Sequence, residues 1–144
     1  MILSQTAEYA LRAMAALATV PFGQPVRAQD LSRATGIPSH YLSKVMRRLV
    51  VAGLLVSQKG QGGGFSLSKP PGDIPFIDIL TAVDAYPAGG TCAFGWGECD
   101  DDNHCPLHSS WSQLSDQLKE WAEGTTLGDI AEQAGSNPRI AILP

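Results

Sequence analysis

The sequence predicts a mainly α-helical protein of the α+β class with one small β element. Three observations favour this fold class. Apolar residues recur at helical spacing through most of residues 6–52, the period shortens to that of strands over residues 54–68, and a helical period returns from residue 106. The chain has 144 residues, of which 44% are hydrophobic, so it is long and apolar enough to bury a core. This composition excludes a disordered tail, a collagen-like repeat and a mini-protein that depends on disulfides.

The first part of the chain predicts three helices, at residues 6–20, 26–35 and 39–52. Gly36 follows the second helix and Gly53 follows the third, and glycine commonly ends a helix. Pro38 opens the third helix, where the proline ring costs no hydrogen bond. Two helices joined by a tight turn that contains glycine form a helix-turn-helix.

The chain then changes to the periodicity of strands. Residues 54–58 and 64–68 predict two short strands, and residues 59–63 between them form a glycine-rich tip that carries Lys59 and Gln61. A helix-turn-helix followed directly by such a hairpin is a winged helix-turn-helix, in which the hairpin is the wing.

The remaining predicted elements are a helix at residues 74–83, an irregular segment at 87–103, a long helix at 106–123 and a short helix at 127–134. The apolar residues of the long helix follow steps of four, three, four and three: Leu107, Trp111, Leu114, Leu118 and Trp121. This spacing forms an a/d seam over about two heptads and suits pairing with a partner helix. The alternative is a helix packed on its own core, but the polar remainder of this helix favours a dimerisation helix.

The formal net charge of −4 argues against a polyanionic partner, but it averages two different halves. Residues 1–70 contain eight Lys and Arg against two Asp and Glu, a net charge of +6, whereas residues 71–144 have a net charge of −10. The sign changes at Pro70–Gly72, which is therefore the predicted domain boundary.

The basic half predicts a DNA-binding domain at residues 1–70. The N-terminal end of a recognition helix faces base edges, and residues one turn later contact phosphates. The glycine tip of the wing lets the backbone approach a duplex closely. The predicted DNA-binding residues are Ser39, His40, Tyr41, Ser43, Lys44, Arg47, Arg48, Lys59 and Gln61. The alternative, a solvated basic face, explains the charge but not its combination with a winged helix-turn-helix.

Three cysteines, Cys92, Cys99 and Cys105, lie in one loop and are separated by six and five residues. This spacing is too long for a zinc knuckle and suits thiolates that hold an iron–sulfur cluster. The fourth ligand is His108, three residues after the last cysteine, or Glu8 from outside the loop. His104 is also near, but its side chain points elsewhere if the helix begins at residue 106. Structural zinc, one disulfide with a free thiol, and thiols without a cofactor remain alternatives.

The region at residues 71–144 is thus predicted to contain a cluster-binding loop (about 87–108) and the dimerisation helix (about 106–123). No secretory signal or membrane-spanning run is visible, so we expect a cytoplasmic protein without a membrane partner. A thiol-based enzyme is disfavoured, because no Cys-x-x-Cys pair, nucleophile–base arrangement or nucleotide-binding loop is apparent.

Several segments occur in a characteristic order: residues 6–14 (TAEYALRAM), 37–44 (IPSHYLSK), 60–65 (GQGGGF), 79–84 (ILTAVD), the three-cysteine loop, 105–111 (CPLHSSW) and 126–130 (TLGDI). This order resembles the IscR/NsrR-type family of bacterial winged helix-turn-helix transcription regulators, many of which sense through an iron–sulfur cluster. The resemblance covers nearly the whole chain. It implies a homodimer that binds a pseudo-palindromic operator on double-stranded DNA, and it implies no enzymatic activity.

The resemblance also implies that Cys92, Cys99 and Cys105 are cluster ligands. In the branch that senses cluster supply, a histidine at the position of His108 completes a [2Fe–2S] site. In the branches that sense nitric oxide or redox state, an acidic residue of the other subunit has this role, and Glu8 stands at its position. A [2Fe–2S] cluster is favoured over [4Fe–4S], and a cofactor-free member of the family that senses through thiol oxidation is the alternative. The position of Ser43 is often acidic in the cluster-supply branch, so the DNA specificity of that branch is not transferred.

Overall fold

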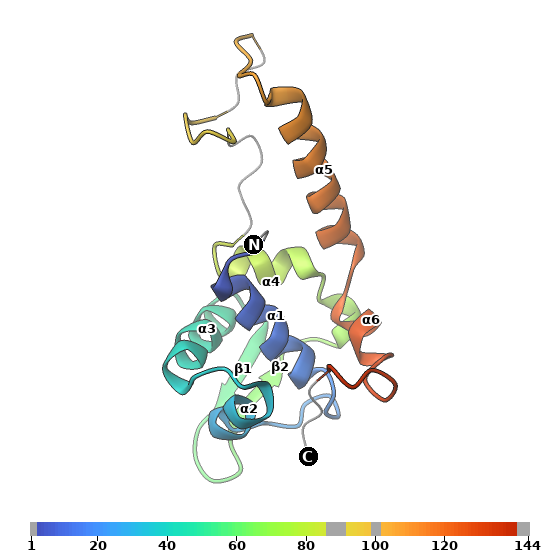
Figure 1. Ribbon diagram of the computed structural model, residues 1–144. Helices are drawn as coiled ribbons and strands as arrows, with labels where there is room; N and C mark the ends of the chain where they lie inside the picture. Colours follow the sequence, from blue (N-terminus) through green and yellow to red (C-terminus); the bar gives the residue numbers. More distant parts are fainter. Residues whose placement is uncertain (1–2, 86–91, 99–101, 141–144) are drawn as a thin grey trace.

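The computed structural model describes residues 3–85, 92–98 and 102–140. In chain order the elements are α1 (Gln5–Leu17), α2 (Ala28–Thr35), α3 (Ser39–Val51), β1 (Leu55–Gln58), β2 (Gly64–Leu67), the 3₁₀ helix η1 (Pro71–Asp73), α4 (Phe76–Ala82), α5 (His108–Gly124) and α6 (Leu127–Ala131). α1 to α4, the hairpin and α6 form one body, from which α5 projects (Figure 1). The mainly α fold with a small sheet is confirmed.

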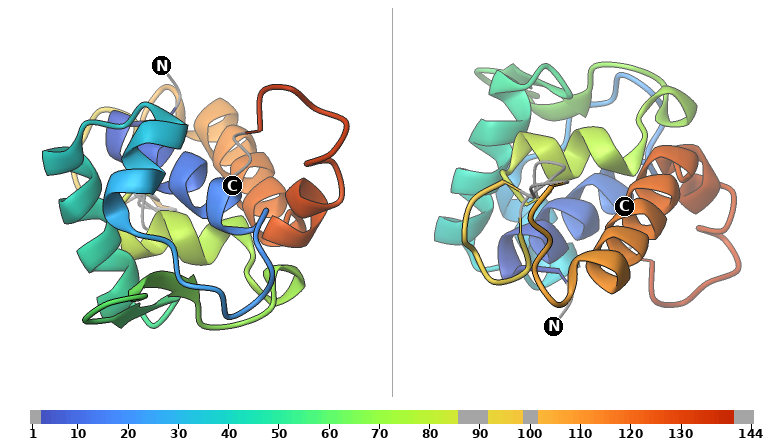
Figure 2. Two further views of the ribbon diagram at one scale, coloured as in Figure 1. Left: turned by 90° about the horizontal axis from the view of Figure 1, so that it is seen from below. Right: turned by 90° about the horizontal axis from the view of Figure 1, so that it is seen from above.

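The helix-turn-helix forms as the sequence predicts. Ser4 caps α1 by accepting a hydrogen bond from the Ala7 N–H at 3.2 Å, and the alanine-rich face of α1 is buried. α2 ends at Gly36, whose φ of +73° is the left-handed conformation in which glycine is favoured. The turn then leads into α3, which packs on both α1 and α2 (Figure 2).

The wing is a two-stranded antiparallel hairpin in which Leu55 pairs with Leu67 and Gln58 with Gly64. Val26, before α2, adds an isolated bridge to this hairpin through two hydrogen bonds of 2.8 Å with Phe65. α2 therefore begins at Ala28 and not at residue 26 as predicted, because Val26 is engaged in the sheet. The predicted strands themselves are confirmed.

The hydrophobic core continues across the predicted boundary at Pro70–Gly72. Ile74, Ile79 and Leu80 are fully buried in the same core as α1 and α3, and so is Leu127 of α6. The division into residues 1–70 and 71–144 thus remains a prediction about function, since the two parts share one packed interior.

Several further helix ends differ from the prediction; α4, for example, begins at Phe76 and not at residue 74. α1 ends at Leu17 and not at residue 20, because the Thr19 N–H and hydroxyl both turn back to the Ala16 carbonyl, at 3.1 and 2.6 Å. α6 ends at Ala131 and not at residue 134, since tighter turns follow it. α5 begins at His108 and not at residue 106, after a turn closed by a 3.0 Å hydrogen bond from the His108 N–H to the Cys105 carbonyl.

α5 is the most exposed helix among the described residues. Ala122, near its C-terminal end, is its one fully buried residue. The Trp121 ring packs edge-on against Phe76 of α4 with ring centroids 5.5 Å apart, and the N-terminal end of α5 lies far from the body (Figure 1). No helix within the described ranges is long and apolar enough to cross a membrane.

Candidate functional site

The outward face of α3 carries most of the predicted DNA-binding residues. Leu42, Val45, Met46 and Leu49 are buried on the opposite face, because apolar residues at this spacing share one side of a helix. The predicted DNA-binding residues of this helix are all exposed: Ser39, His40, Tyr41, Ser43, Lys44, Arg47 and Arg48. Their contact with DNA stays a prediction.

The wing tip carries the two other predicted DNA-binding residues. Lys59 and Gln61 are exposed between β1 and β2. The hairpin that holds them is fixed to the body through the Val26–Phe65 bridge. The bridge thus attaches the hairpin to the chain segment that precedes α2.

The side chains of Ser43 and Arg48, both predicted to bind DNA, also make hydrogen bonds within the protein. The Ser43 hydroxyl donates to the Ser39 carbonyl at 2.9 Å, which leaves its oxygen as an acceptor. The Arg48 Nη1 donates to the Val83 carbonyl at 3.0 Å, so this side chain joins α3 to the end of α4. The sequence gives no indication of the second contact, because the two residues lie 35 positions apart.

Tyr41 takes part in an aromatic cluster that joins the start of α3 to α1. Its ring lies 4.2 Å from that of His40 and 5.9 Å from that of Tyr9, measured between ring centroids. The Arg12 guanidinium lies 5.6 Å from the centroid of the Tyr9 ring, within the range of a cation–π interaction. These contacts join the N-terminal end of α3 to α1, and the spacing of these residues in the sequence does not indicate them.

Cys92 and Cys105 lie together at the thiol loop, and Cys99 lies outside the described residues. The backbone N–H of Phe94 donates to the Cys92 sulfur and lowers the pKa of this thiol. Burial opposes this shift, whereas the N–H groups of Trp96 and Gly95 and the Cys105 thiol act with Phe94.

Backbone hydrogen bonds within residues 92–97 close a turn around the Cys92 sulfur. The Cys92 N–H donates to the Gly97 carbonyl, and the Gly95 N–H donates to the Cys92 carbonyl, both at 2.9 Å. Backbone N–H groups directed at a sulfur stabilise a thiolate, which is the form that ligates iron. The donor set of this loop therefore fits an iron–sulfur cluster.

The two candidate fourth ligands do not join the thiols within one protomer. His108 stacks on His104, with centroids 3.8 Å apart and planes 6° from parallel. The expectation that His104 points elsewhere assumed a helix from residue 106; α5 begins at His108, so that condition is not met and the orientation of His104 toward a cluster stays untested. Glu8 is half-buried in the first turn of α1. Among the described residues, no three His, Cys, Asp or Glu side chains are grouped closely enough to hold a metal ion.

An exposed aromatic pair stands beside Cys92. Phe94 and Trp96 stack with ring centroids 4.5 Å apart and planes 13° from parallel, and they are 46% and 71% exposed. Neither residue is among the predicted site residues. The sequence does contain a signal for this pair. Two large aromatic residues flank a glycine between two cysteines, in a loop where burial in a core is not expected.

Comparison with known proteins identifies relatives along nearly the whole chain. A family model described as "Rrf2: Iron-dependent Transcriptional regulator" matches residues 3–133. The HTH-type transcriptional regulator IscR of Cronobacter sakazakii is 35% identical over 130 residues, which cover 90% of this chain and 80% of that protein.

Two solved structures share the fold. CymR, described as the global cysteine regulator of B. subtilis, has a TM-score of 0.75 and 26% identity, covering 90% of this chain and 95% of that one. IscR of T. potens has a TM-score of 0.74 and 26% identity, covering 92% and 87%. These proteins are regulators and not enzymes, in line with the sequence-based expectation.

Proposed function

The chain belongs to the Rrf2 family of transcriptional regulators, and we propose that it binds a pseudo-palindromic operator as a homodimer and senses redox state, nitric oxide or iron–sulfur status through its thiol loop. One observation carries the sensing proposal. The Cys92 sulfur accepts hydrogen bonds from three backbone N–H groups and contacts the Cys105 thiol. DNA binding is the common property of the family, whereas the residues and the cofactor are our assignment.

The DNA contact is assigned to α3 and the wing. In the homodimer two α3 helices enter successive major grooves, with half-site centres roughly 34–36 Å apart or a multiple of this distance. The residues at the start of α3 face base edges, namely Ser39, His40, Tyr41, Ser43 and Lys44, and Arg47 and Arg48 one turn later contact phosphates. Lys59 and Gln61 at the wing tip extend the contact along the backbone. The net charge of +6 on residues 1–70 supports this assignment.

The dimer contact is assigned to the apolar face of α5. Leu107 and Leu114 are 45% and 55% exposed in the protomer, which is unusual for leucines aligned along one helix face. Trp121 at the other end is 42% exposed and also contacts Phe76 of the same chain, so it joins the seam to the body. A second copy of α5 covers this face.

The cofactor is assigned to Cys92, Cys99 and Cys105, with His108 or the other subunit's Glu8 as fourth ligand. When bound, an iron–sulfur cluster supplies one-electron redox chemistry and a reactive target for nitric oxide or oxygen. The chain itself provides thiolates, backbone N–H groups around Cys92 and an exposed loop that admits small oxidants. A [2Fe–2S] cluster is favoured, and [4Fe–4S] is the alternative.

Anaerobic purification followed by absorption and electron paramagnetic resonance spectroscopy tests the cofactor. We expect coloured protein with sulfur-to-iron charge-transfer bands and acid-labile sulfide, and we expect Cys92→Ala to lose both while remaining a folded dimer. Colourless protein with stoichiometric zinc overturns the assignment.

The fourth ligand is identified by comparing Glu8→Ala with His108→Ala. His104→Ala is the matched control, because it removes the other member of the stacked pair. The variant that alters the spectrum names the ligand. An unchanged spectrum in both variants excludes both residues.

A cofactor-free thiol sensor is the second candidate, favoured by the contact between the Cys92 and Cys105 thiols. Two adjacent thiols form a disulfide when an oxidant such as a peroxide removes two electrons and two protons. Mass analysis of peroxide-treated protein, together with iron and sulfide analysis of untreated protein, separates the two candidates. A Cys92–Cys105 disulfide in protein that never held iron supports the second candidate.

A further inference from the structure

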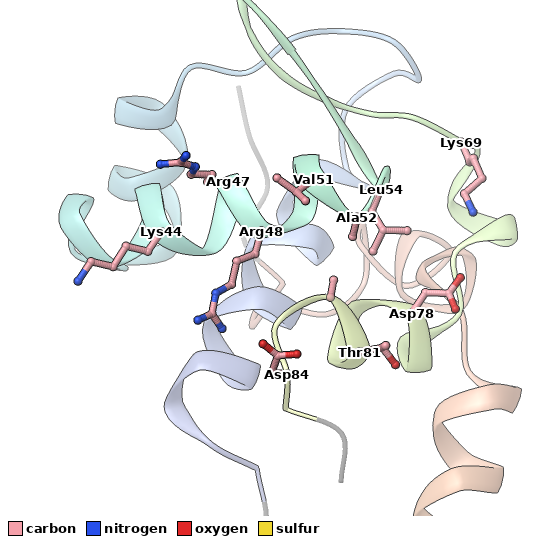
Figure 3. A pocket seen from close by; sticks show the side chains of 11 residues that line it. Lys44, Arg47, Arg48, Val51, Ala52, Leu54, Lys69, Asp78, Thr81 and Asp84 are labelled. Atoms are coloured by element: carbon pink, nitrogen blue, oxygen red, sulfur yellow. The ribbon is translucent and has the colours of Figure 1, made fainter. Parts of the chain in front are cut away.

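A groove of about 800 Å³ lies between α3 and α4, on the side of α3 away from α2 (Figure 3). We refer to it as the α3–α4 groove. Its charged lining has four cations and two carboxylates: Lys44, Arg47 and Arg48 of α3 and Lys69 after the wing, opposite Asp78 of α4 and Asp84 just after α4. Its volume lies within the usual range for small-molecule sites.

Opposite charges meet at both ends of the groove. Arg48 and Asp84 lie at one end, and Lys69 and Asp78 lie at the other (Figure 3). With respect to the other described residues, the side chains of Lys69, Asp78 and Asp84 make no hydrogen bond or ion pair. Arg48 uses one N–H for the Val83 carbonyl and keeps further donors for a ligand.

The middle of the groove is apolar. Val51, Ala52 and Leu54 line it from α3 and the start of the wing, and Ala82 lines it from α4. Val51 is 81% exposed, which leaves its isopropyl group available to an occupant. An apolar centre with charged groups at the ends is typical of a site that recognises a small molecule with a polar end and an apolar body.

The end of α4 fixes the position of Asp84. Asp84 has a φ of +53°, and no other non-glycine residue in the described ranges has a positive φ. This conformation closes a Schellman motif at the end of α4, in which the Asp84 N–H donates to the Thr81 carbonyl at 3.1 Å and the Ala85 N–H donates to the Leu80 carbonyl at 2.9 Å. Here it directs the chain away from α4 while the carboxylate lies at the groove.

We propose that the α3–α4 groove binds a small dipolar molecule of the amino-acid or short-peptide class. Its carboxylate pairs with the Arg48 guanidinium, its ammonium group pairs with the Asp84 carboxylate, and its apolar body lies over Val51 and Leu54. The four cations of the lining disfavour a simple amine, and the two carboxylates favour a ligand that carries an ammonium group as well as a carboxylate over a simple anion.

The position of the groove gives this site a regulatory meaning. One wall is the helix assigned to DNA recognition, and the other is the helix that leads toward the thiol loop. An occupant that bridges Arg48 and Asp84 therefore contacts both elements. This site goes beyond the proposed cluster, because its residues are separate from the thiols and its binding test does not need the cluster.

Calorimetric titration of the full-length protein tests the proposal with L-leucine and with the dipeptide L-leucyl-L-leucine as probes. N-acetyl-L-leucine lacks the ammonium group and L-leucinamide lacks the carboxylate, so they are the matched controls. We expect at least one dipolar probe to bind at least about tenfold more tightly than both controls, the usual effect of losing a charged hydrogen bond. Binding of neither dipolar probe, or equal binding of either control, overturns the proposal.

Two substitutions locate the site. Asp84→Asn keeps a side chain that tolerates a positive φ and removes the charge, whereas Asp73→Asn removes an exposed carboxylate that does not line the groove. We expect Asp84→Asn to weaken binding by about tenfold and Asp73→Asn to leave it unchanged. Arg48→Lys keeps the charge but loses the planar guanidinium, and we expect weaker binding. Unchanged binding in both Asp84→Asn and Arg48→Lys overturns the proposal.

Discussion

The wing depends on the absence of a side chain at Gly64, and replacing Gly64 with alanine tests this dependence. Gly64 has a φ of +145°, and a Cβ atom there would overlap the Val26 carbonyl group. The backbone conformation alone costs an alanine about 1–3 kcal/mol. If the overlap separates Val26 from Phe65, two hydrogen bonds are lost at about 1 kcal/mol each. We therefore expect Gly64→Ala to lower the free energy of unfolding by about 3–5 kcal/mol.

Gly62→Ala is the matched control at the same tip. Gly62 also has a positive φ, +78°, but a Cβ atom there meets nothing within 4 Å. Its expected loss is only the conformational cost of about 1–2 kcal/mol. Urea unfolding of both variants at one protein concentration measures the difference, because the stability of a dimer depends on concentration. Equal losses in the two variants would refute the role assigned to the Val26–Phe65 bridge.

Three further predictions follow from the assigned surfaces. Arg47→Ala should weaken DNA binding and reduce the slope of log affinity against log salt concentration by about 1, whereas Lys119→Ala on α5 should change neither quantity. Fluorescence anisotropy measures both the affinity and the slope. An unchanged slope for Arg47→Ala argues against a phosphate contact. Leu114→Asp should raise the dimer dissociation constant at least about a hundredfold, since an apolar contact is lost in both copies, whereas the exposed Gln117→Asp should not. Sedimentation velocity measures this difference, and a dimer retained by Leu114→Asp contradicts the α5 contact. In cluster-free protein the lowered pKa of Cys92 keeps its thiol ionised at lower pH. Alkylation of Cys92 by iodoacetamide should therefore reach half its maximal rate at a lower pH than alkylation of free cysteine. A midpoint at or above the pH found for free cysteine would contradict the N–H contacts.

Local patterns predict the winged helix-turn-helix because its elements are fixed by nearby residues. The α3 face that carries Leu42 and Leu49 follows the helical period, and Gly36 marks the turn before it. The hairpin follows from the change of period after Gly53. The predicted start of α2 was wrong by two residues, because Val26 is held in a bridge to Phe65, which is distant in the sequence.

The candidate site was predicted in its residue types more than in its contacts. Cys92 and Cys105 lie together as the loop suggested, but the N–H groups that surround Cys92 depend on a turn that composition does not reveal. The pairing of Arg48 with Val83 depends on how α4 packs against α3, which no local pattern records. His108 stacks on His104 because the helix begins two residues later than its periodicity indicated.

The attachment of α5 has a mechanical consequence. The helix is anchored near Ala122 and Trp121, while Cys105 and His108 stand at its free end. Seventeen residues span about 25 Å, so a displacement of roughly 4 Å at the free end corresponds to a rotation of about 10° at the anchor. A small displacement at the thiol end of α5 is thus equivalent to a small rotation of the whole helix about its contact with α4. We expect a rearrangement of a few ångströms around the thiols to reach the body as a small rotation of α5 at its contact with α4.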